Sequence, residues 1–156
     1  MAITLNASTS SGFVQSADNS GIITLQNNGT NAVTVDNGNL QFNSGYGSVA
    51  TAYGCRAWVN FNGTGTVAIR ASGNVSSITD IGTGTYTVNL TNTISDANYA
   101  ILIGTGFASG LREDVFAVVY NDAPYTPTTS AYTIKFFRAD TNVAVDSDYA
   151  MTSIFR

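Results

Sequence analysis

The chain has 156 residues, enough for one domain with its own core, and only 10% of them are charged, against about 25% in ordinary globular proteins. Its net charge at pH 7 is −4, and its six Lys and Arg residues are scattered, which argues against nucleic-acid binding by phosphate neutralisation. The absence of histidine excludes Ser-His-Asp and Cys-His catalysis and nearly all zinc chemistry.

The N-terminus carries no recognisable targeting or membrane-spanning segment. Residues 1–4 lack the positive and long apolar regions of a secretory signal, and no apolar run reaches the roughly 18 residues that span a bilayer. We therefore expect synthesis in a cytosol and no membrane insertion. The single cysteine, Cys55, cannot form an internal disulfide and is expected to be a small buried residue.

Residues 1–45 consist of short extended segments with few large side chains. Strands are predicted near residues 3–5, 22–25, 33–35 and 40–42, with turns at 27–30 and 37–38. Only two aromatic residues, Phe13 and Phe42, occur before residue 46. Such a segment cannot easily build a core of its own. We expect it to bury its apolar side chains against the following domain or against copies of itself.

Residues 55–71 predict a β-hairpin. The first strand alternates between two faces, one with Ala57, Val59 and Phe61 and the other with Arg56, Trp58 and Asn60. The sequence Asn-Gly-Thr-Gly at 62–65 then supplies two glycines that accept positive φ, and residues 66–71 return as the second strand. Phe61 is therefore predicted to point into a core.

Two further strands are predicted before residue 104. The turn Gly-Thr-Gly at 82–84 leads into residues 85–91, where Tyr86, Val88 and Leu90 alternate with polar side chains. Residues 99–103 are almost wholly apolar, which predicts a strand that is buried on both faces in the middle of a sheet. Residues 104–110 are predicted to be a Gly/Ser loop.

Four segments within residues 55–103 occur in a familiar order: W-V-N-F-N-G-T-G-T-V-A-I-R, N-V-S-S-I-T-D, G-T-G-T-Y-T-V-N and D-A-N-Y-A. This order resembles a module of the structural proteins of tailed bacteriophages, especially tail fibres and other virion appendages. Residues 1–21 and the following L-Q-N-N-G-T-N-A-V-T-V-D are similar to segments that begin many such proteins. The resemblance implies a structural and binding element of the virion, made in the host cytoplasm and typically homotrimeric, without a catalytic motif.

The rest of the chain completes an all-β pattern. Strands are predicted at 115–120, 132–138 and 149–155, and a loop at 121–129 holds Pro124 and Pro127. No window shows helical periodicity. We therefore expect an antiparallel β-sandwich of jelly-roll or immunoglobulin-like topology over residues 46–156, preceded by an extended β-rich assembly or attachment segment over residues 1–45.

Aromatic residues are the candidate contacts with a ligand or a neighbouring subunit. Trp58 lies on the polar face of its strand, where it suits either a subunit contact or a platform for stacking against a sugar ring. Tyr120, Tyr125 and Tyr132 lie in or beside the proline loop, where they suit either a ligand surface or packing of the loop. No residue is assigned to catalysis, to a cofactor or to a metal.

Carboxylates cluster only at Glu113-Asp114 and at Asp146 and Asp148. Sequence does not bring these groups into the facing pair that a glycosidase needs. Asp146 and Asp148 are compatible with a solvated turn or with part of a calcium site. The pattern lacks the glycine and the later glutamate of an EF-hand loop.

The sequence predicts a non-enzymatic structural component of a tailed-phage virion, namely a tail-fibre or appendage protein that contributes to host adsorption. Two alternatives stay open: a capsid decoration or head-fibre protein, and a free carbohydrate-binding, lectin-like module. The expected partners are further copies of the chain in a homotrimer, other virion proteins and a host-surface glycan.

Overall fold

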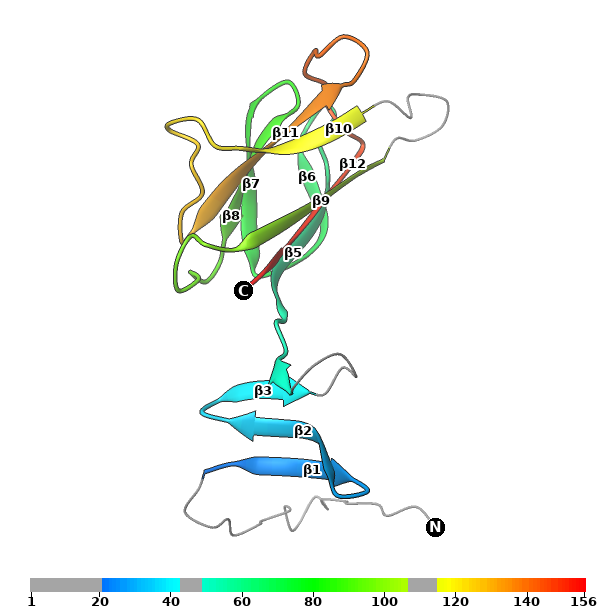
Figure 1. Ribbon diagram of the computed structural model, residues 1–156. Coiled ribbons are helices and arrows are strands. Elements are labelled where there is room, and N and C mark those ends of the chain that lie inside the picture. Colours follow the sequence, from blue (N-terminus) through cyan, green and yellow to red (C-terminus); the bar gives the residue numbers. More distant parts are fainter. Residues whose placement is uncertain (1–20, 43–48, 107–114) are drawn as a thin grey trace, which may run out of the picture. The chain divides into compact units, whose positions relative to one another are not determined.

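The computed structural model describes residues 21–42, 49–106 and 115–156, and every regular element among them is a β-strand (Figure 1). The expectation of an all-β chain is confirmed. The chain forms two compact units, Met1–Ala52 and Tyr53–Arg156. This division lies after the one predicted at residue 45, because β4 (Ala50–Thr51) pairs with β3 (Asn39–Phe42) and so belongs to the first unit. The strand predicted at residues 3–5 lies outside the described residues.

The first unit contains one antiparallel sheet with the order β1-β2-β3-β4, in which β1 is Ile23–Asn27 and β2 is Thr30–Asp36. Two-residue turns join the first three strands, Asn28-Gly29 and Asn37-Gly38, and φ is positive at all four residues. Positive φ at both central residues defines the type I′ turn, whose twist matches that of the flanking strands. The strands and turns predicted over residues 22–42 are therefore confirmed.

The second unit is a β-sandwich of eight strands in two antiparallel sheets, as expected. The sheet orders are β6-β5-β12-β9 and β10-β11-β8-β7. The strand bounds are β5 Cys55–Asn62, β6 Ala68–Gly73, β7 Val75–Gly82, β8 Thr85–Leu90, β9 Ala100–Gly106, β10 Val115–Tyr120, β11 Ala131–Arg138 and β12 Tyr149–Phe155. The first and last strands of the unit, β5 and β12, are neighbours.

The core of the sandwich lies between the two sheets and is built from the inward positions of β5, β8, β11 and β12. Its largest fully buried side chains are Tyr86, Tyr132, Phe61, Phe136, Ile134 and Ile154. The rings of Phe61 and Tyr86 meet edge to face with centroids 5.2 Å apart, a favoured aromatic geometry. The inward faces predicted for residues 55–62 and 85–91 are thus confirmed.

The predicted position of residues 99–103 is wrong. Strand β9 lies at the edge of its sheet and pairs with β12 alone, and it continues to Gly106 where a loop was expected. Its side chains alternate, because Ile101 and Ile103 pack against the core while Leu102 is 55% exposed on the outer face. An apolar run therefore does not prove burial on both faces of a strand.

The predicted hairpin exists, but its details differ. Strand β6 begins at Ala68 rather than at residue 66, and the positive φ of the turn belongs to Gly65 and not to Gly63. A glycine is needed at position 63 because the Tyr86 side chain lies so near its backbone. A Cβ there would be 2.6 Å from the hydroxyl oxygen of Tyr86. Strand β7 was not predicted, because polar residues and two register shifts against β8 hide its alternation.

Candidate interaction surfaces

One face of the sheet of the first unit carries six apolar side chains. The strand register places Ile23, Val35 and Leu40 in one cross-strand row and Leu25, Val33 and Phe42 in the next. Residues directly opposite one another in an antiparallel sheet point to the same side, so all six share a face. We call these six side chains the N-terminal apolar face.

The N-terminal apolar face is open to solvent within the described part of the chain. Five of its six side chains are between 37% and 59% exposed, and the sixth, Val33, is half-buried. The opposite face is polar, with Thr24, Thr34 and Gln41 in one row. Large exposed apolar patches mark interaction sites on soluble proteins. This face is therefore a candidate surface for association.

Trp58 lies on the outer face of the sheet β6-β5-β12-β9, where it is 44% exposed, as its predicted outward position requires. Its indole lies against Gly73 of β6, because a Cβ at Gly73 would be 2.5 Å from the indole nitrogen. Ser153 of β12 is the cross-strand partner of both Trp58 and Leu102. A small residue thus separates two large ones.

A hollow of about 440 Å³ lies at this place and is lined mainly by Trp58, Leu102, Met151, Ser153 and Asn60. We call it the Trp58 trough. Near it, the guanidinium of Arg70 lies 4.2 Å from the ring centre of Tyr149 and its Nη1 lies 3.5 Å from Oδ1 of Asn60. The trough combines apolar walls with a hydroxyl and an amide, which suits a stacked sugar ring or an apolar side chain of a neighbour.

Tyr120 and Tyr125 lie together and stack on each other, with ring centroids 5.1 Å apart and an angle of 27° between the rings. The Nζ of Lys135 lies 5.1 Å from the ring centre of Tyr120 and 4.9 Å from that of Phe137, which in turn stacks on Phe116. Both tyrosines are half-buried. The stacking covers one face of each tyrosine ring, which reduces the ring surface that is open to a ligand.

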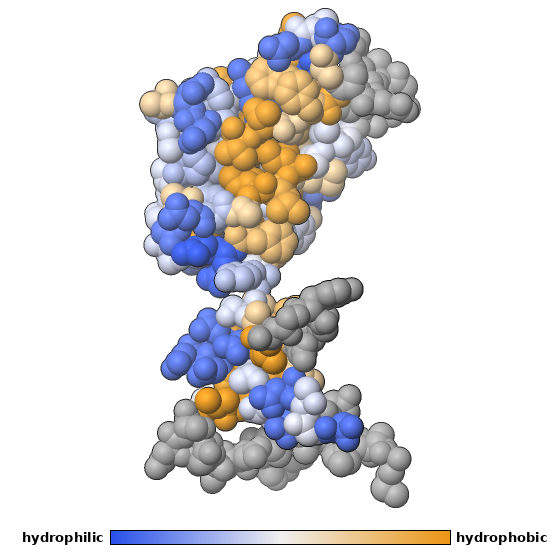
Figure 2. Space-filling view, viewed as in Figure 1, coloured by the Kyte–Doolittle hydropathy of each residue, from blue (hydrophilic) through white to orange (hydrophobic). Residues whose placement is uncertain are grey.

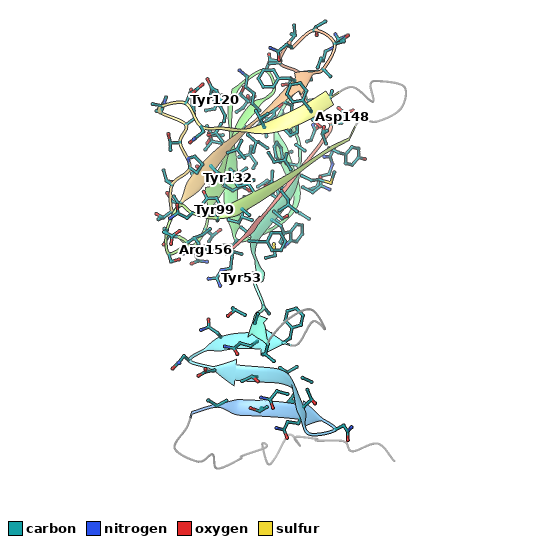
Figure 3. The ribbon with its side chains drawn as sticks, viewed as in Figure 1. Tyr53, Tyr99, Tyr120, Tyr132, Asp148 and Arg156 are labelled. Atoms are coloured by element: carbon teal, nitrogen blue, oxygen red, sulfur yellow. The ribbon has the colours of Figure 1, made fainter. Side chains whose placement is uncertain are left out.

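Tyr132 is not a surface residue, which corrects its prediction as a contact residue. It is 1% exposed and points from β11 into the core (Figure 3). Its hydroxyl forms a hydrogen bond with Thr152, and its ring meets that of Tyr99 edge to face. Burial raises the pKa of Tyr132 to about 12. Its inward position follows from the alternation of β11, in which Tyr132, Ile134 and Phe136 share the core-facing side.

Asp146 anchors three loops at one end of the sandwich. Its carboxylate accepts a hydrogen bond from the backbone N–H of Gly84 at 2.6 Å and lies 2.7 Å from the hydroxyl of Tyr86. The neighbouring residue, Ser147, accepts a hydrogen bond from the backbone N–H of Gly63 at 2.8 Å. Asp146 therefore has a structural role in the fold. Glu113 and Asp114 lie outside the described residues.

Within residues 21–42, 49–106 and 115–156, no group of three or more His, Cys, Asp or Glu side chains is placed to hold a metal ion. The same residues contain no helix long and apolar enough to cross a membrane. Cys55 is exposed rather than buried, which corrects the expectation for its thiol.

Sequence reasoning missed several residues of these surfaces. Leu102, Met151 and Ser153 of the trough come from strands that only the sheet order brings beside Trp58. Phe116 and Phe137 can be identified from the sequence, since both occupy outward positions of strands whose side chains alternate between two faces. Comparison of the chain with family models, with curated proteins and with solved structures finds no match.

Proposed function

We propose that this chain is a non-enzymatic structural component of a tailed-phage virion, a tail-fibre or appendage protein that associates with copies of itself through the N-terminal apolar face. The observation that carries the association is the in-register alignment of six apolar side chains on one open face. The assignment to a virion and the number of three copies rest on the resemblance of residues 55–103.

Burial of this face between copies would stabilise an assembly strongly. Each large aliphatic or aromatic side chain contributes about 1.5–3 kcal/mol when it moves from water to an apolar interior. Asp36 is the one charged residue among residues 21–42 and 49–52, so identical copies meet little repulsion there. Closed symmetric association covers such a face in every copy.

The test of the virion assignment is localisation on particles of a phage that encodes this chain. An antibody against the purified chain, bound to intact virions and viewed by electron microscopy, is expected to label an appendage. Label on the head would favour the capsid-decoration alternative. Particles that lack the chain, by labelling and by mass spectrometry, would contradict the proposal.

Carbohydrate binding is a second candidate function, favoured by the Trp58 trough. A partly exposed indole on a rigid sheet, beside Ser153 and Asn60, provides a stacking surface and hydrogen-bonding groups for a sugar ring. Glycan-array binding by the intact chain tests it. Binding should be lost in Trp58→Ala and kept in Tyr53→Ala, which removes a more exposed aromatic ring away from the trough. Equal binding by both variants would contradict a site at the trough.

A further inference from the structure

The two long sides of the sandwich differ in how their strand edges are protected. Strands β6 and β7 lie at the edges on one side, and β9 and β10 lie next to each other at the edges on the other (Figure 1). An unpaired edge is a template for pairing with another chain, and natural proteins protect edges with charges, prolines or bulges. The distribution of these protecting features can therefore reveal which edge is covered.

The side formed by β6 and β7 has such protection. Strand β6 carries Arg70 and β7 carries Asp80. The register shifts once between β5 and β6 and twice between β7 and β8. Charges and irregular pairing discourage the addition of a further strand.

Within the part of the chain that the structure describes, the side formed by β9 and β10 has none of this protection. Their sequences, A-I-L-I-G-T-G and V-F-A-V-V-Y, contain no charged residue and no proline, and their pairing with β12 and β11 shows no register shift. Each has a partner strand on one side alone. We call this side of the sandwich the open side.

The hydrophobic core reaches the surface on the open side. Ile101 and Ile103 of β9 and Val115 and Ala117 of β10 pack against the core and are only half-buried. Figure 2 shows the resulting apolar patch over these two strands. The hydroxyl of Thr105 on β9 is already bonded to that of Ser147.

We infer that the open side contacts the open side of another copy of this chain, so that the sandwich units as well as the N-terminal sheets take part in the assembly. Neither strand carries charge, so identical copies meet without like-charge repulsion. Contact of the open sides around a common symmetry axis covers the half-buried apolar residues of every copy. This inference rests on the proposed self-association and adds a second interface to it.

Site-directed cross-linking of the full chain tests the inference. In a Cys55→Ser background, single cysteines replace Leu102 on β9 or Phe116 on β10, and the control replaces Ile81 on β7. Phe116 and Ile81 are matched in exposure, at 40% and 41%. A short bis-maleimide should link copies through positions 102 and 116 and leave the position-81 variant unlinked. Equal linking at position 81 would overturn the inference.

Hydrogen exchange on the unmodified chain gives a second measurement that needs no substitution. The amides of β9 and β10 should exchange more slowly than those of β6 and β7, and should lose this protection when dilution dissociates the assembly. Sedimentation of the same samples separates the open-side contact from the proposed self-association. A trimer without cross-links at 102 and 116 overturns the open-side contact and leaves the proposed function standing, whereas a monomer overturns both.

Discussion

The hydroxyl of Tyr86 lies 2.7 Å from the carboxylate of Asp146, although the two residues are 60 positions apart in the chain. The same hydroxyl lies 2.8 Å from the carbonyl oxygen of Gly63, and the carboxylate also accepts the N–H of Gly84. Burial, followed by the hydrogen bond to Asp146, raises the pKa of Tyr86 far above its usual value. The phenol therefore links the segments that hold Gly63 and Asp146, and the Asp146 carboxylate extends the link to Gly84.

The first prediction removes that hydroxyl. Tyr86→Phe keeps the ring in the core but removes the single hydroxyl proton that is shared between the Asp146 carboxylate and the Gly63 carbonyl, so the free energy of unfolding should fall by about 1–3 kcal/mol. Urea unfolding followed by fluorescence measures the loss. Tyr53→Phe alters an exposed ring and should change stability by less than about 0.5 kcal/mol. Equal effects of the two variants would contradict a structural role for the Tyr86 hydroxyl.

The second prediction concerns Gly63, which is close to Tyr86 and has no room for a side chain. In Gly63→Ala the new methyl group would lie 2.6 Å from the Tyr86 hydroxyl and 2.9 Å from the carbonyl oxygen of Ser147. Relief of this overlap should cost about 1–3 kcal/mol of stability. Gly54→Ala is the matched control, since a Cβ at Gly54 meets nothing within 4 Å. A Gly63→Ala chain as stable as Gly54→Ala would show that the loop moves aside freely.

The third prediction tests the core itself. Phe61 is fully buried, so Phe61→Ala should cost about 3–5 kcal/mol from lost transfer energy and from the cavity left behind. Thermal or denaturant unfolding gives the value. The control, Ile81→Ala, truncates a largely exposed side chain on β7 and should have a small effect. A loss below about 1 kcal/mol at Phe61 would contradict its placement.

Much of this fold could be predicted from local alternation and turn chemistry. Asn28-Gly29 and Asn37-Gly38 fix the N-terminal hairpins, and the alternation around Phe61 and Tyr86 identifies the inward faces. Sheet order could not be predicted, because it depends on pairing between distant strands such as β5 and β12.

The errors share that cause. The apolar sequence of β9 would look the same in the middle of a sheet as at its edge, and only the order of strands decides between them. The Trp58 trough likewise exists because Ser153 stands between Trp58 and Leu102 across three strands. For Tyr132, by contrast, the local alternation of β11 is a sufficient signal of burial.

The fourth prediction concerns alkaline pH. Burial raises the pKa values of Tyr99 and Tyr132 from 10.0 to about 12 in the folded chain. The unfolded chain therefore loses these protons first as pH rises, and the folded state binds more protons between the two values. The stability that these groups contribute is complete below pH 10 and is lost as pH rises towards about 12.

Unfolding in urea at a series of pH values measures this dependence. Tyr132→Phe is expected to flatten the loss of stability between pH 10 and pH 12, although it also lowers stability at neutral pH by removing the hydrogen bond to Thr152. An unchanged slope in the variant would contradict the link to Tyr132.

The fifth prediction concerns the N-terminal apolar face. Leu25→Asp places a charge on this face and should weaken the association measurably while leaving the sandwich folded, since burial of an unpaired carboxylate between copies is costly. Gln26→Glu adds the same charge in the same strand at an exposed position outside the face and should leave the assembly intact. Association as tight in Leu25→Asp as in the unmodified chain would exclude this face as an interface.

Sedimentation equilibrium of the unmodified full chain is the most direct test of the central claim, which is that the chain works as a self-associated structural protein. The mass of one chain is 16.3 kDa. The proposed homotrimer predicts three times this mass over a wide range of concentration. A mass of 16.3 kDa at every concentration would contradict the claim.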